Sequence, residues 1–349
     1  MPLAPRARPD VEAVFADVEI LGFSGLVEID PTRPDADWAL VVSVDGIDYR
    51  TEVSAPIAPD AHRALLAAKA AKLARLEPML RCPDRPAGAD TACGGTLDRL
   101  DEATLRCVRC QRRYGATARH FDFLTPELRQ LGAIVSTDNV SNHGYDPIAE
   151  RLLAECADGL VLDNGSGMRS HYREQVVNFE IVDYATTDVL GIGESLPFAD
   201  ESFDGLLSLA VLEHVRDPFR CADEITRVLK PGGRIYVAVP FLQPYHGYPS
   251  HFYNMSWQGL ENLFVDRFDV EESGTPEYGH PIWTLTWFLE SYVQGLPPDT
   301  ARRFRALRVD ELMGSGLEHL EREYAVGLDE ERRRELASMS YVLATKRGS

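Results

Sequence analysis

A short apolar run that ends in a glycine-rich turn is the feature that most constrains the fold of this chain. Residues 159–170 read GLVLDNGSGMRS. The apolar part is typical of a buried strand, and Gly165 and Gly167 allow the backbone to approach a ligand without a side-chain clash. Residues 170–175 are expected to form a helix whose first N–H groups are free. Strand, glycine turn and helix in this order predict a nucleotide-binding turn.

A second strand is expected at residues 177–182, where the apolar run ends in Asp183. Asp183 follows Asp163 by about 20 residues, a spacing at which a carboxylate can hold the ribose hydroxyls of a nucleotide. The glycine pattern alone also fits a dinucleotide site. Later segments are therefore needed to separate the two kinds of site.

Three later segments provide that separation. Residues 196–204 read LPFADESFD, residues 210–218 read AVLEHVRDP, and residues 228–240 read VLKPGGRIYVAVP. In this order they resemble class I S-adenosylmethionine-dependent methyltransferases, in the broad group that includes ubiquinone- and small-molecule-type enzymes. The resemblance covers about residues 138–270. It implies an α/β, Rossmann-like, seven-stranded methyltransferase fold with an antiparallel last strand, the last two strands being expected at residues 268–272 and 340–346.

The resemblance also implies a set of residues that bind S-adenosyl-L-methionine. They are Asp163, Gly165, Gly167, Asp183, Glu194, Ser195, Leu212 and His214. The glycine turn would hold the methionine part, Asp183 the ribose, and residues 194–195 the adenine, with residues 212–214 as the floor. Arg169 stands where the family pattern has a third glycine, and Ile192 stands where it has an acidic residue near the adenine. These departures leave a non-catalytic cofactor-binding relative as an alternative.

The N-terminal part, residues 1–80, is expected to be a β/α extension. Residues 11–53 alternate apolar and polar side chains and predict a small antiparallel β element. Residues 59–80 predict a connecting helix with Asp60 as its cap and an apolar face that includes Ala64, Leu73 and Leu76.

Four of the six cysteines lie in residues 81–123. Cys82, Cys93, Cys107 and Cys110 resemble the ligands of a small zinc ribbon, and four thiolates suit tetrahedral Zn²⁺. The first pair is spaced more widely than usual, by an insert rich in proline, alanine and glycine that can loop out. Disulfides or a ribbon that has lost its metal are the alternatives.

The third part, residues 124–349, is expected to be the methyltransferase domain. The loop at residues 241–254 leaves the fifth expected strand at the ligand-binding edge of the sheet and is dense in aromatic and imidazole side chains. Its candidate catalytic residues are Tyr245, His246 and His251; the imidazoles could take a proton from an acceptor or only bind and pack. A helical insert at about residues 275–339 is either a cap over the acceptor site or a homodimer interface.

Charge and hydropathy limit the partners. The net charge is −19, from 36 basic and 55 acidic residues, which makes a nucleic-acid partner unlikely because such proteins normally carry a basic footprint. No apolar run approaches the roughly 20 residues of a membrane span, and the N-terminus lacks a secretory apolar segment, so a cytoplasmic location is expected. The expected acceptor is a small molecule, sugar or lipid precursor. An rRNA base methyltransferase is the alternative, because one such family also pairs an N-terminal zinc module with this core.

Overall fold

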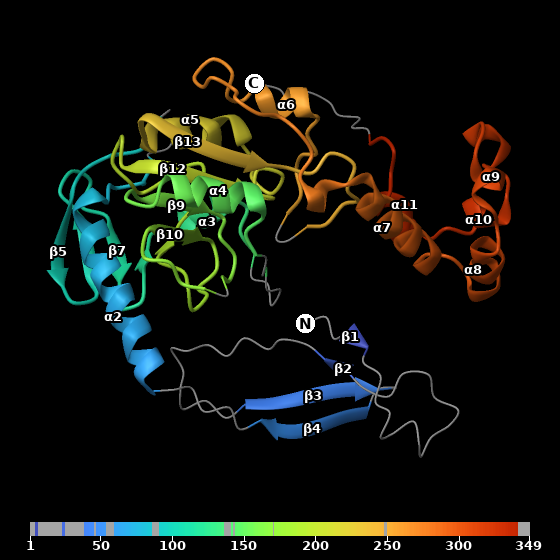
Figure 1. The fold of residues 1–349 in the computed structure, drawn as a ribbon, viewed down its shortest axis with the longest axis horizontal. Coiled ribbons are helices and arrows are strands. Elements are labelled where there is room, and N and C mark those ends of the chain that lie inside the picture. Colours follow the sequence, from blue (N-terminus) through green and yellow to red (C-terminus); the bar gives the residue numbers. More distant parts are fainter. Residues whose placement is uncertain are drawn as a thin grey trace, which may run out of the picture.

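The computed structural model describes residues 4–5, 23–24, 38–44, 47–53, 59–85, 91–135, 141, 144–169, 171–247 and 250–340. Within this part, nine strands form one mixed sheet, with the remaining four strands in two separate two-stranded sheets. Helices lie on both sides of the nine-stranded sheet (Figure 1). This arrangement confirms the expected α/β class.

Five parallel strands make up one half of the large sheet. They are β9 (Val161–Asn164), β10 (Val176–Glu180), β11 (Val189–Leu190), β12 (Phe203–Leu209) and β13 (Leu229–Ala238). Their spatial order is β13-β12-β9-β10-β11. The chain therefore runs outward from β9 to β11 and then returns to the other side of β9. In such a sheet, ligands bind beyond the carboxyl ends of the strands at the point where the order reverses, here between β9 and β12.

The strands bury both faces, and alternate residues face opposite sides. Val161, Val176 and Leu207 pack with Leu152 on one face. The neighbouring positions in these strands, such as Leu162, join the main core on the other face. Because successive side chains of a strand point to opposite faces, helices α4 (Pro147–Glu155) and α5 (Pro218–Val228), which belong to the two different clusters, cover opposite faces of the sheet.

Both of these helices begin at an Asp-Pro pair. The Asp146 carboxylate accepts a hydrogen bond from the Ala149 N–H, and the Asp217 carboxylate accepts one from the Arg220 N–H. Aspartate at the N-cap satisfies an N–H group that has no partner within the helix, and proline suits the first helical position. The local sequence thus fixes where each helix starts.

The other half of the sheet comes from the cysteine-bearing segment. It contains β5 (Leu97–Asp101), β6 (Thr104–Cys107), β7 (Arg113–Ala116) and β8 (Phe121–Asp122). These four strands pair antiparallel with one another, and β8 pairs parallel with β11. The sheet therefore crosses the expected boundary between residues 81–123 and 124–349.

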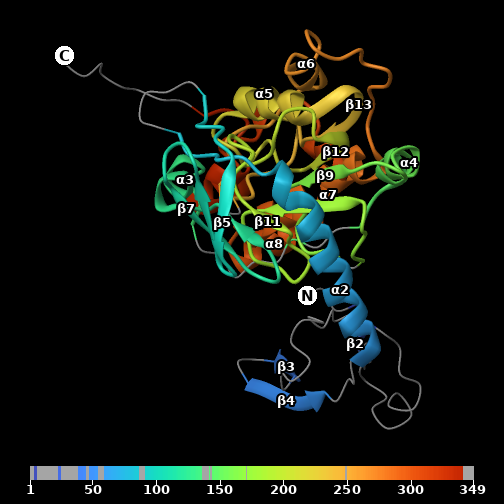
Figure 2. The same cartoon turned by 90° about the vertical axis from the view of Figure 1, so that its left-hand side faces the viewer.

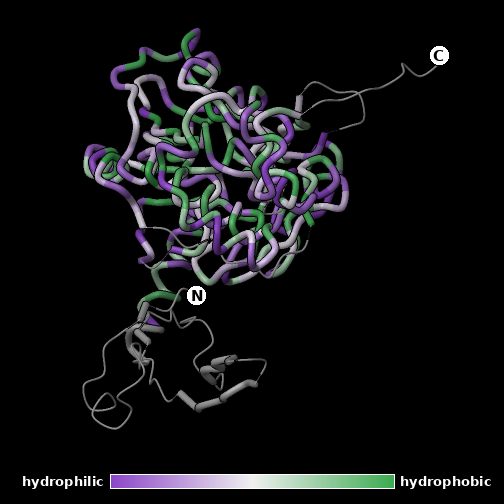
Figure 3. Tube along the Cα trace, turned by 90° about the vertical axis from the view of Figure 1, so that its right-hand side faces the viewer, coloured by the Kyte–Doolittle hydropathy of each residue, from purple (hydrophilic) through white to green (hydrophobic). Residues whose placement is uncertain are grey.

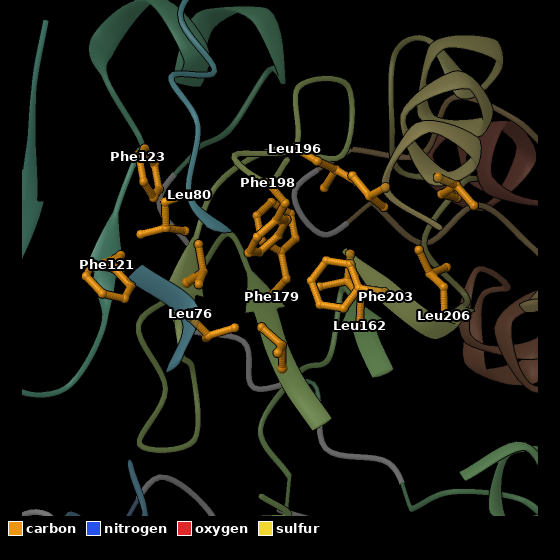
Figure 4. Packing of buried hydrophobic residues seen from close by; sticks show 14 of the residues in the cluster. Leu76, Leu80, Phe121, Phe123, Leu162, Phe179, Leu196, Phe198, Phe203 and Leu206 are labelled. Atoms are coloured by element: carbon orange, nitrogen blue, oxygen red, sulfur yellow. The ribbon is translucent and has the colours of Figure 1, made fainter. Parts of the chain in front are cut away.

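The hydrophobic core also crosses that boundary. Figure 4 shows Phe121 and Phe123 from the cysteine-bearing segment in the same hydrophobic cluster as Phe179, Phe198 and Phe203. The rings of Phe179 and Phe198 are 6.0 Å apart, and those of Phe198 and Phe203 are 5.0 Å apart and perpendicular. Edge-to-face pairs of this kind add to the stabilisation that burial gives. The two halves thus share one core.

The N-terminal part forms a hairpin and a helix. Strands β3 (Trp38–Val44) and β4 (Ile47–Val53) pair antiparallel, as the alternation predicts. Short strands β1 (Ala4–Pro5) and β2 (Phe23–Ser24) also pair antiparallel. Helix α2 (Pro59–Leu76), followed by the 3-10 turn η1 (Glu77–Met79), leads from this hairpin to the body (Figure 2).

The buried face of α2 differs from the expected one. Leu73 and Leu76 are buried, but Ala64 is exposed, and Lys69 and Lys72 are buried instead. Lys69 Nζ donates to the carbonyl of Thr187 at 2.6 Å, and Lys72 Nζ lies 3.0 Å from the buried Asp188 carboxylate. Asp60 lies inside the helix rather than at its cap. The ion pair, which sequence periodicity does not reveal, anchors α2 to the sheet.

Two expected elements differ from the structure, and most of a third lies outside the described residues. Residues 171–175 form a bend and a turn rather than a helix, in the connection between the directly paired strands β9 and β10. Residues 268–272 form no strand although they are described; Glu271 and Glu272 instead pair with Arg234 and Arg151. Residues 341–346 lie outside the described residues. The seven-stranded sheet with an antiparallel last strand is therefore not what the described part contains: its antiparallel strands come from the cysteine-bearing segment.

Helices dominate the C-terminal part. They are α6 (Trp257–Glu261), α7 (Pro281–Gln294), α8 (Pro298–Arg305), α9 (Val309–Leu312), α10 (Glu323–Val326) and α11 (Glu330–Glu335). The remaining helix of the body is α3 (Pro126–Leu131). Val293, Leu296 and Phe304 form a small core of their own in this part. Hydrophobic stretches run through the middle of the body in Figure 3. Among the described helices, none has the length and apolar character that crossing a membrane requires.

Candidate functional site

The glycine turn follows β9 directly and faces the end of β12. Gly165 and Gly167 have φ angles of 76° and 62°, a backbone region that side chains disfavour. The N–H groups of Gly165 and Ser166 donate to the carbonyl of Phe179, at the end of β10. A Cβ added to Gly165 would overlap Val211, which follows β12. The turn thus lies at the point where the strand order reverses.

A buried ion pair between Asp163 and Arg169 connects the two ends of this turn. Asp163 is fully buried, and its carboxylate accepts hydrogen bonds from Tyr145 Oη at 2.6 Å and Arg169 Nε at 2.8 Å. Burial raises the pKa of Asp163, whereas Arg169 and Tyr145 act to lower it. The guanidinium of Arg169 stacks 4.2 Å from the Tyr145 ring centre. Arg169 therefore compensates a buried charge, which explains why it replaces a glycine.

The acidic residue at the end of β10 is Glu180 rather than Asp183. Glu180 is buried and lines the cavity beside the turn, and its carboxylate accepts hydrogen bonds from the N–H groups of Gly167 and Val182. Burial raises its pKa against these N–H donors. Asp183 is not among the cavity-lining residues, and its carboxylate lies 3.4 Å from Arg119 and 3.3 Å from His120. The structure thus places Asp183 away from the cavity wall, because β10 ends at Glu180, two residues before the expected end of the strand.

The expected adenine side is a buried loop at residues 192–195. Ile192 and Glu194 line the cavity. The Glu194 carboxylate accepts a hydrogen bond from the Arg216 N–H at 3.1 Å, and burial raises its pKa. Ser195 does not line the cavity; its hydroxyl donates to the carbonyl of Pro83 at 2.7 Å. The cysteine-bearing segment therefore holds this loop in place.

Two neighbouring strands bring the histidines together. Residues 213–214 follow β12 and His246 follows β13, and these strands are parallel neighbours, so their carboxyl ends lie at one edge. The N–H of Phe252 donates to the carbonyl of Glu213 at 2.7 Å, which pins the later loop to the earlier one. The ring centres of His214 and His246 are 5.3 Å apart, and those of His246 and His251 are 4.3 Å apart.

The three imidazoles differ in which ring nitrogens already make a hydrogen bond. His214 Nδ1 lies 2.5 Å from the carbonyl of Ser250, and His246 Nδ1 lies 2.8 Å from that of Pro244. Because a carbonyl only accepts hydrogen bonds, Nδ1 carries the proton in both rings and Nε2 keeps its lone pair.

In His251, by contrast, both ring nitrogens have a hydrogen-bond partner. Its Nδ1 accepts from the His246 N–H at 3.1 Å and its Nε2 lies 2.7 Å from Asn254 Oδ1, so both of its ring nitrogens are used. Burial lowers the pKa of His214 to about 4 and also lowers that of His251.

Of the candidate catalytic residues, only His246 lines the cavity. Tyr245 and His251 are not among its walls; their rings stack on each other with centres 5.6 Å apart. His214 lines the cavity, whereas Leu212 is fully buried in the core.

A large open cavity joins the glycine turn to the histidines. Its volume is about 2020 Å³, above the roughly 300–1,000 Å³ of an ordinary ligand pocket. Aromatic side chains of the C-terminal part line the region opposite the turn: Tyr278, Trp283, Trp287 and Phe288. The Trp287 ring centre lies 5.3 Å from that of His246. The cavity thus has room for two ligands, one at the turn and one under α7.

The four cysteines of residues 81–123 gather into one cluster. Cys82 Sγ is 3.5 Å from Cys110 Sγ, and Cys93 Sγ is 3.7 Å from Cys107 Sγ. None of the six cysteines, all of which are described, is in a disulfide. Zinc–sulfur bonds of about 2.3 Å in a tetrahedron place sulfurs ~3.8 Å apart, so the donor set fits a zinc ion. Burial would raise the pKa of Cys107, but the N–H groups of Cys110 and Arg109 outweigh it and lower that pKa.

Sequence reasoning missed two buried acids. Glu180 lies within the apolar run VVNFEIV, and Glu213 lies within AVLEHV. A carboxylate in an apolar run is a signal in itself, since such groups are seldom buried without a partner. Glu213 is fully buried, and neither of its carboxylate oxygens has a hydrogen-bond partner among the described residues. Burial raises its pKa to about 8.

Comparison with known proteins finds methyltransferases. Residues 143–237 match the family model described as "Methyltransferase domain". An uncharacterized methyltransferase of Mycolicibacterium vanbaalenii is 45% identical over 65 residues, 18% of this chain and 26% of that protein. A demethylmenaquinone methyltransferase of Clavibacter sepedonicus is 35% identical over 86 residues, 25% of this chain and 34% of the other.

Structural similarity is weaker. The structure of a putative methyltransferase from Bacillus halodurans is 21% identical to this chain, the similarity spans 35% of this chain and 69% of the other, and the TM-score is 0.29. The chain spans about a quarter of the length of the curated relatives that it matches first, 26% and 23%. Residues 143–237 are therefore similar to a methyltransferase domain, and the activity of the whole protein is a matter of proposal.

Proposed function

We propose that this chain transfers a methyl group from S-adenosyl-L-methionine to a small-molecule, sugar or lipid-precursor acceptor. One observation carries the proposal: the glycine turn at the switch point opens into an aromatic-lined cavity with room for a second ligand. This turn lies within the segment that matches a methyltransferase domain. The acidic net charge of −19 favours a small acceptor over RNA.

The residues around the turn fit the cofactor. The left-handed glycines give the turn a backbone path that a side chain would block, because a Cβ at Gly165 would overlap Val211. Glu180, at the cavity wall, is proposed to hold the ribose hydroxyls in place of Asp183, and Ile192 and Glu194 to contact the adenine. S-adenosylmethionine supplies an already activated methyl group, so this chain mainly has to align donor and acceptor, which can contribute about 7–11 kcal/mol.

His246 is the proposed base for an acceptor that must lose a proton. Its Nδ1–H is bound to a backbone carbonyl, which leaves Nε2 to accept a proton within the cavity. An imidazole suits this role near neutral pH. His246→Ala is expected to lower turnover about 10²–10⁴-fold with little effect on cofactor affinity. Tyr245 and His251 are proposed to position the loop rather than to react.

The cysteine cluster is proposed to bind one structural Zn²⁺. The sulfur spacings and the absence of disulfides support this role. A closed site of four thiolates would stabilise the edge of the sheet rather than take part in methyl transfer.

The experiment that tests the proposal combines binding and turnover. Titration calorimetry with S-adenosylmethionine should show binding to the wild type and none to Gly165→Val, in which the added side chain overlaps Val211. Incubation with radiolabelled donor and a small-metabolite extract should then give a labelled product. Binding without any labelled product would favour a non-catalytic cofactor-binding protein, and absence of binding would refute the proposal.

A further inference from the structure

A cluster of ligand-type side chains lies on the cavity wall beyond the glycine turn. One ligand atom each from Glu213, His214 and His246 lies within 4.8 Å of the others. His214 Nε2 is 3.7 Å from Glu213 Oε1. His214 and His246 line the cavity, while Glu213 lies behind them and is fully buried. The proposed methyl transfer uses neither Glu213 nor His214 for chemistry.

The state of Glu213 is the first observation that needs an explanation. Both of its carboxylate oxygens lack a hydrogen-bond partner among the described residues. A buried carboxylate without a partner is strongly unfavourable unless a cation or a proton compensates it. Asp163, Glu180 and Glu194, the other buried carboxylates around the cavity, all accept hydrogen bonds from protein groups.

The orientation of the two imidazoles is the second observation. Backbone carbonyls hold the Nδ1–H groups of His214 and His246, as described above, and leave both Nε2 lone pairs available. Metal-binding histidines commonly donate their second N–H to a carbonyl or carboxylate, which fixes the tautomer and orients the ring. The ring of His214 directs Nε2 toward the unpartnered carboxylate, at the distance given above.

We propose that Glu213, His214 and His246 bind a divalent transition-metal ion on the wall of the cavity. Two imidazoles and one carboxylate are a common ligand set for Zn²⁺ and for Fe²⁺, and they leave coordination positions open. Metal–ligand bonds of about 2.0–2.2 Å require the three ligand atoms to move closer together than in this structure. Because the histidines line the cavity, the open positions face it, and an oxygen of the acceptor is the class of ligand that fits them.

This site is distinct from the cysteine cluster in both ligands and role. Thiolates fill all four positions of a structural zinc site, whereas this site has only nitrogen and oxygen donors and stays open. With an ion bound, His246 acts as a ligand rather than as a base, and the ion itself would lower the pKa of an acceptor hydroxyl. His251 then positions the loop, because its Nδ1 accepts the N–H of His246.

Cobalt absorption tests the proposal on the full-length chain. Protein stripped of metal with a chelator is titrated with CoCl₂. Thiolate-bound cobalt gives an intense sulfur-to-metal charge-transfer band, and cobalt on nitrogen and oxygen gives only weaker visible bands, so the two sites are read separately. The wild type should take up one cobalt ion of the second kind per chain. Glu213→Gln and His246→Ala should each lose it, while Cys107→Ser should lose only the charge-transfer band.

A matched control and a folding control complete the test. His280→Ala removes an imidazole that also lines the cavity but lies outside the cluster, and it should keep the weaker bands. Circular dichroism establishes that each variant is folded, and S-adenosylmethionine calorimetry checks the cofactor site of the Glu213→Gln, His246→Ala and His280→Ala variants, so the result does not depend on turnover. Failure of the wild type to give the weaker bands, or equal bands in the wild type and both Glu213→Gln and His246→Ala, would overturn the metal site and leave the proposed methyl transfer standing.

Discussion

The choice between Glu180 and Asp183 as the ribose ligand gives the sharpest test of the cofactor site. Glu180 is the last residue of β10 and Asp183 lies three residues further on, but only Glu180 lines the cavity. Glu180→Gln keeps the size of the side chain and one acceptor oxygen. That oxygen can still accept the hydrogen bond from the Gly167 N–H, 3.1 Å away in the wild type, whereas the amide nitrogen takes the place of the oxygen that accepts from the Val182 N–H.

The expected loss of S-adenosylmethionine affinity in Glu180→Gln follows from the hydrogen bonds that this variant cannot make. A ribose offers two adjacent hydroxyl donors, and a carboxylate can accept from both. The glutamine amide cannot accept at its nitrogen, so at least one charge-assisted hydrogen bond disappears, a loss of about 1.5–3 kcal/mol. The dissociation constant for S-adenosylmethionine should therefore rise roughly 10- to 150-fold.

Asp183→Asn is the matched control. The Asp183 side chain is 44% exposed and lies beside Arg119 and His120, and exposed ion pairs contribute little. The affinity of the Asp183→Asn variant for S-adenosylmethionine should stay within about twofold of the wild type by calorimetry. Thermal melting of both variants checks that the turn is intact. Wild-type affinity in Glu180→Gln together with weak binding in Asp183→Asn would refute the assignment and restore Asp183 as the ribose ligand.

Three further predictions concern other parts of the molecule. Purified protein should contain one zinc ion per chain by elemental analysis, and Cys107→Ser should release it; zinc-free wild type made with zinc supplied would contradict this. Burial lowers the pKa of Lys69 from 10.5 to about 8, so the unfolded state binds more protons between these pH values. The unfolding free energy should then rise with pH relative to Lys69→Met, by about 3 kcal/mol in denaturant titrations, and a flat difference would contradict the shift. Residues 278–292 should become protected from hydrogen exchange when cofactor and acceptor bind if they form a cap; protection that depends only on protein concentration would indicate a homodimer.

The parallel half of the sheet was predictable because its sequence signals are local. Apolar runs coincide with β9, with β12 and with the end of β13. Buried parallel strands read as continuous apolar runs because both faces are covered. Such signals need no knowledge of distant residues.

The ends of the strands and the edge of the sheet were not predictable, because they depend on contacts between residues that are distant in the sequence. Ile181 and Val182 extend the apolar run of β10 beyond Glu180, and apolarity alone cannot show where ladder pairing stops. The parallel pairing of β8 with β11 joins residues that are far apart in the chain. Residues 268–272 have the composition of a strand but pair through charged side chains. In each case a tertiary contact overrides the local pattern.

The buried polar groups were also not predictable from local sequence patterns, and they link the cysteine-bearing segment to the candidate site. Periodicity predicted that α2 connects two parts, but Lys69 and Lys72 anchor it beside Asp188. Likewise, the cysteine-bearing segment cannot act as an independent module, because the carbonyl of Pro83 accepts the hydroxyl of Ser195 at 2.7 Å and Arg85 donates to the carbonyl of Glu194 at 2.8 Å. Loss of the proposed zinc ion from the cysteine cluster is expected to loosen residues 82–85 and, through these two hydrogen bonds, the loop proposed to contact the adenine. The Cys107→Ser variant should therefore also bind S-adenosylmethionine more weakly, although no cysteine lines the cavity.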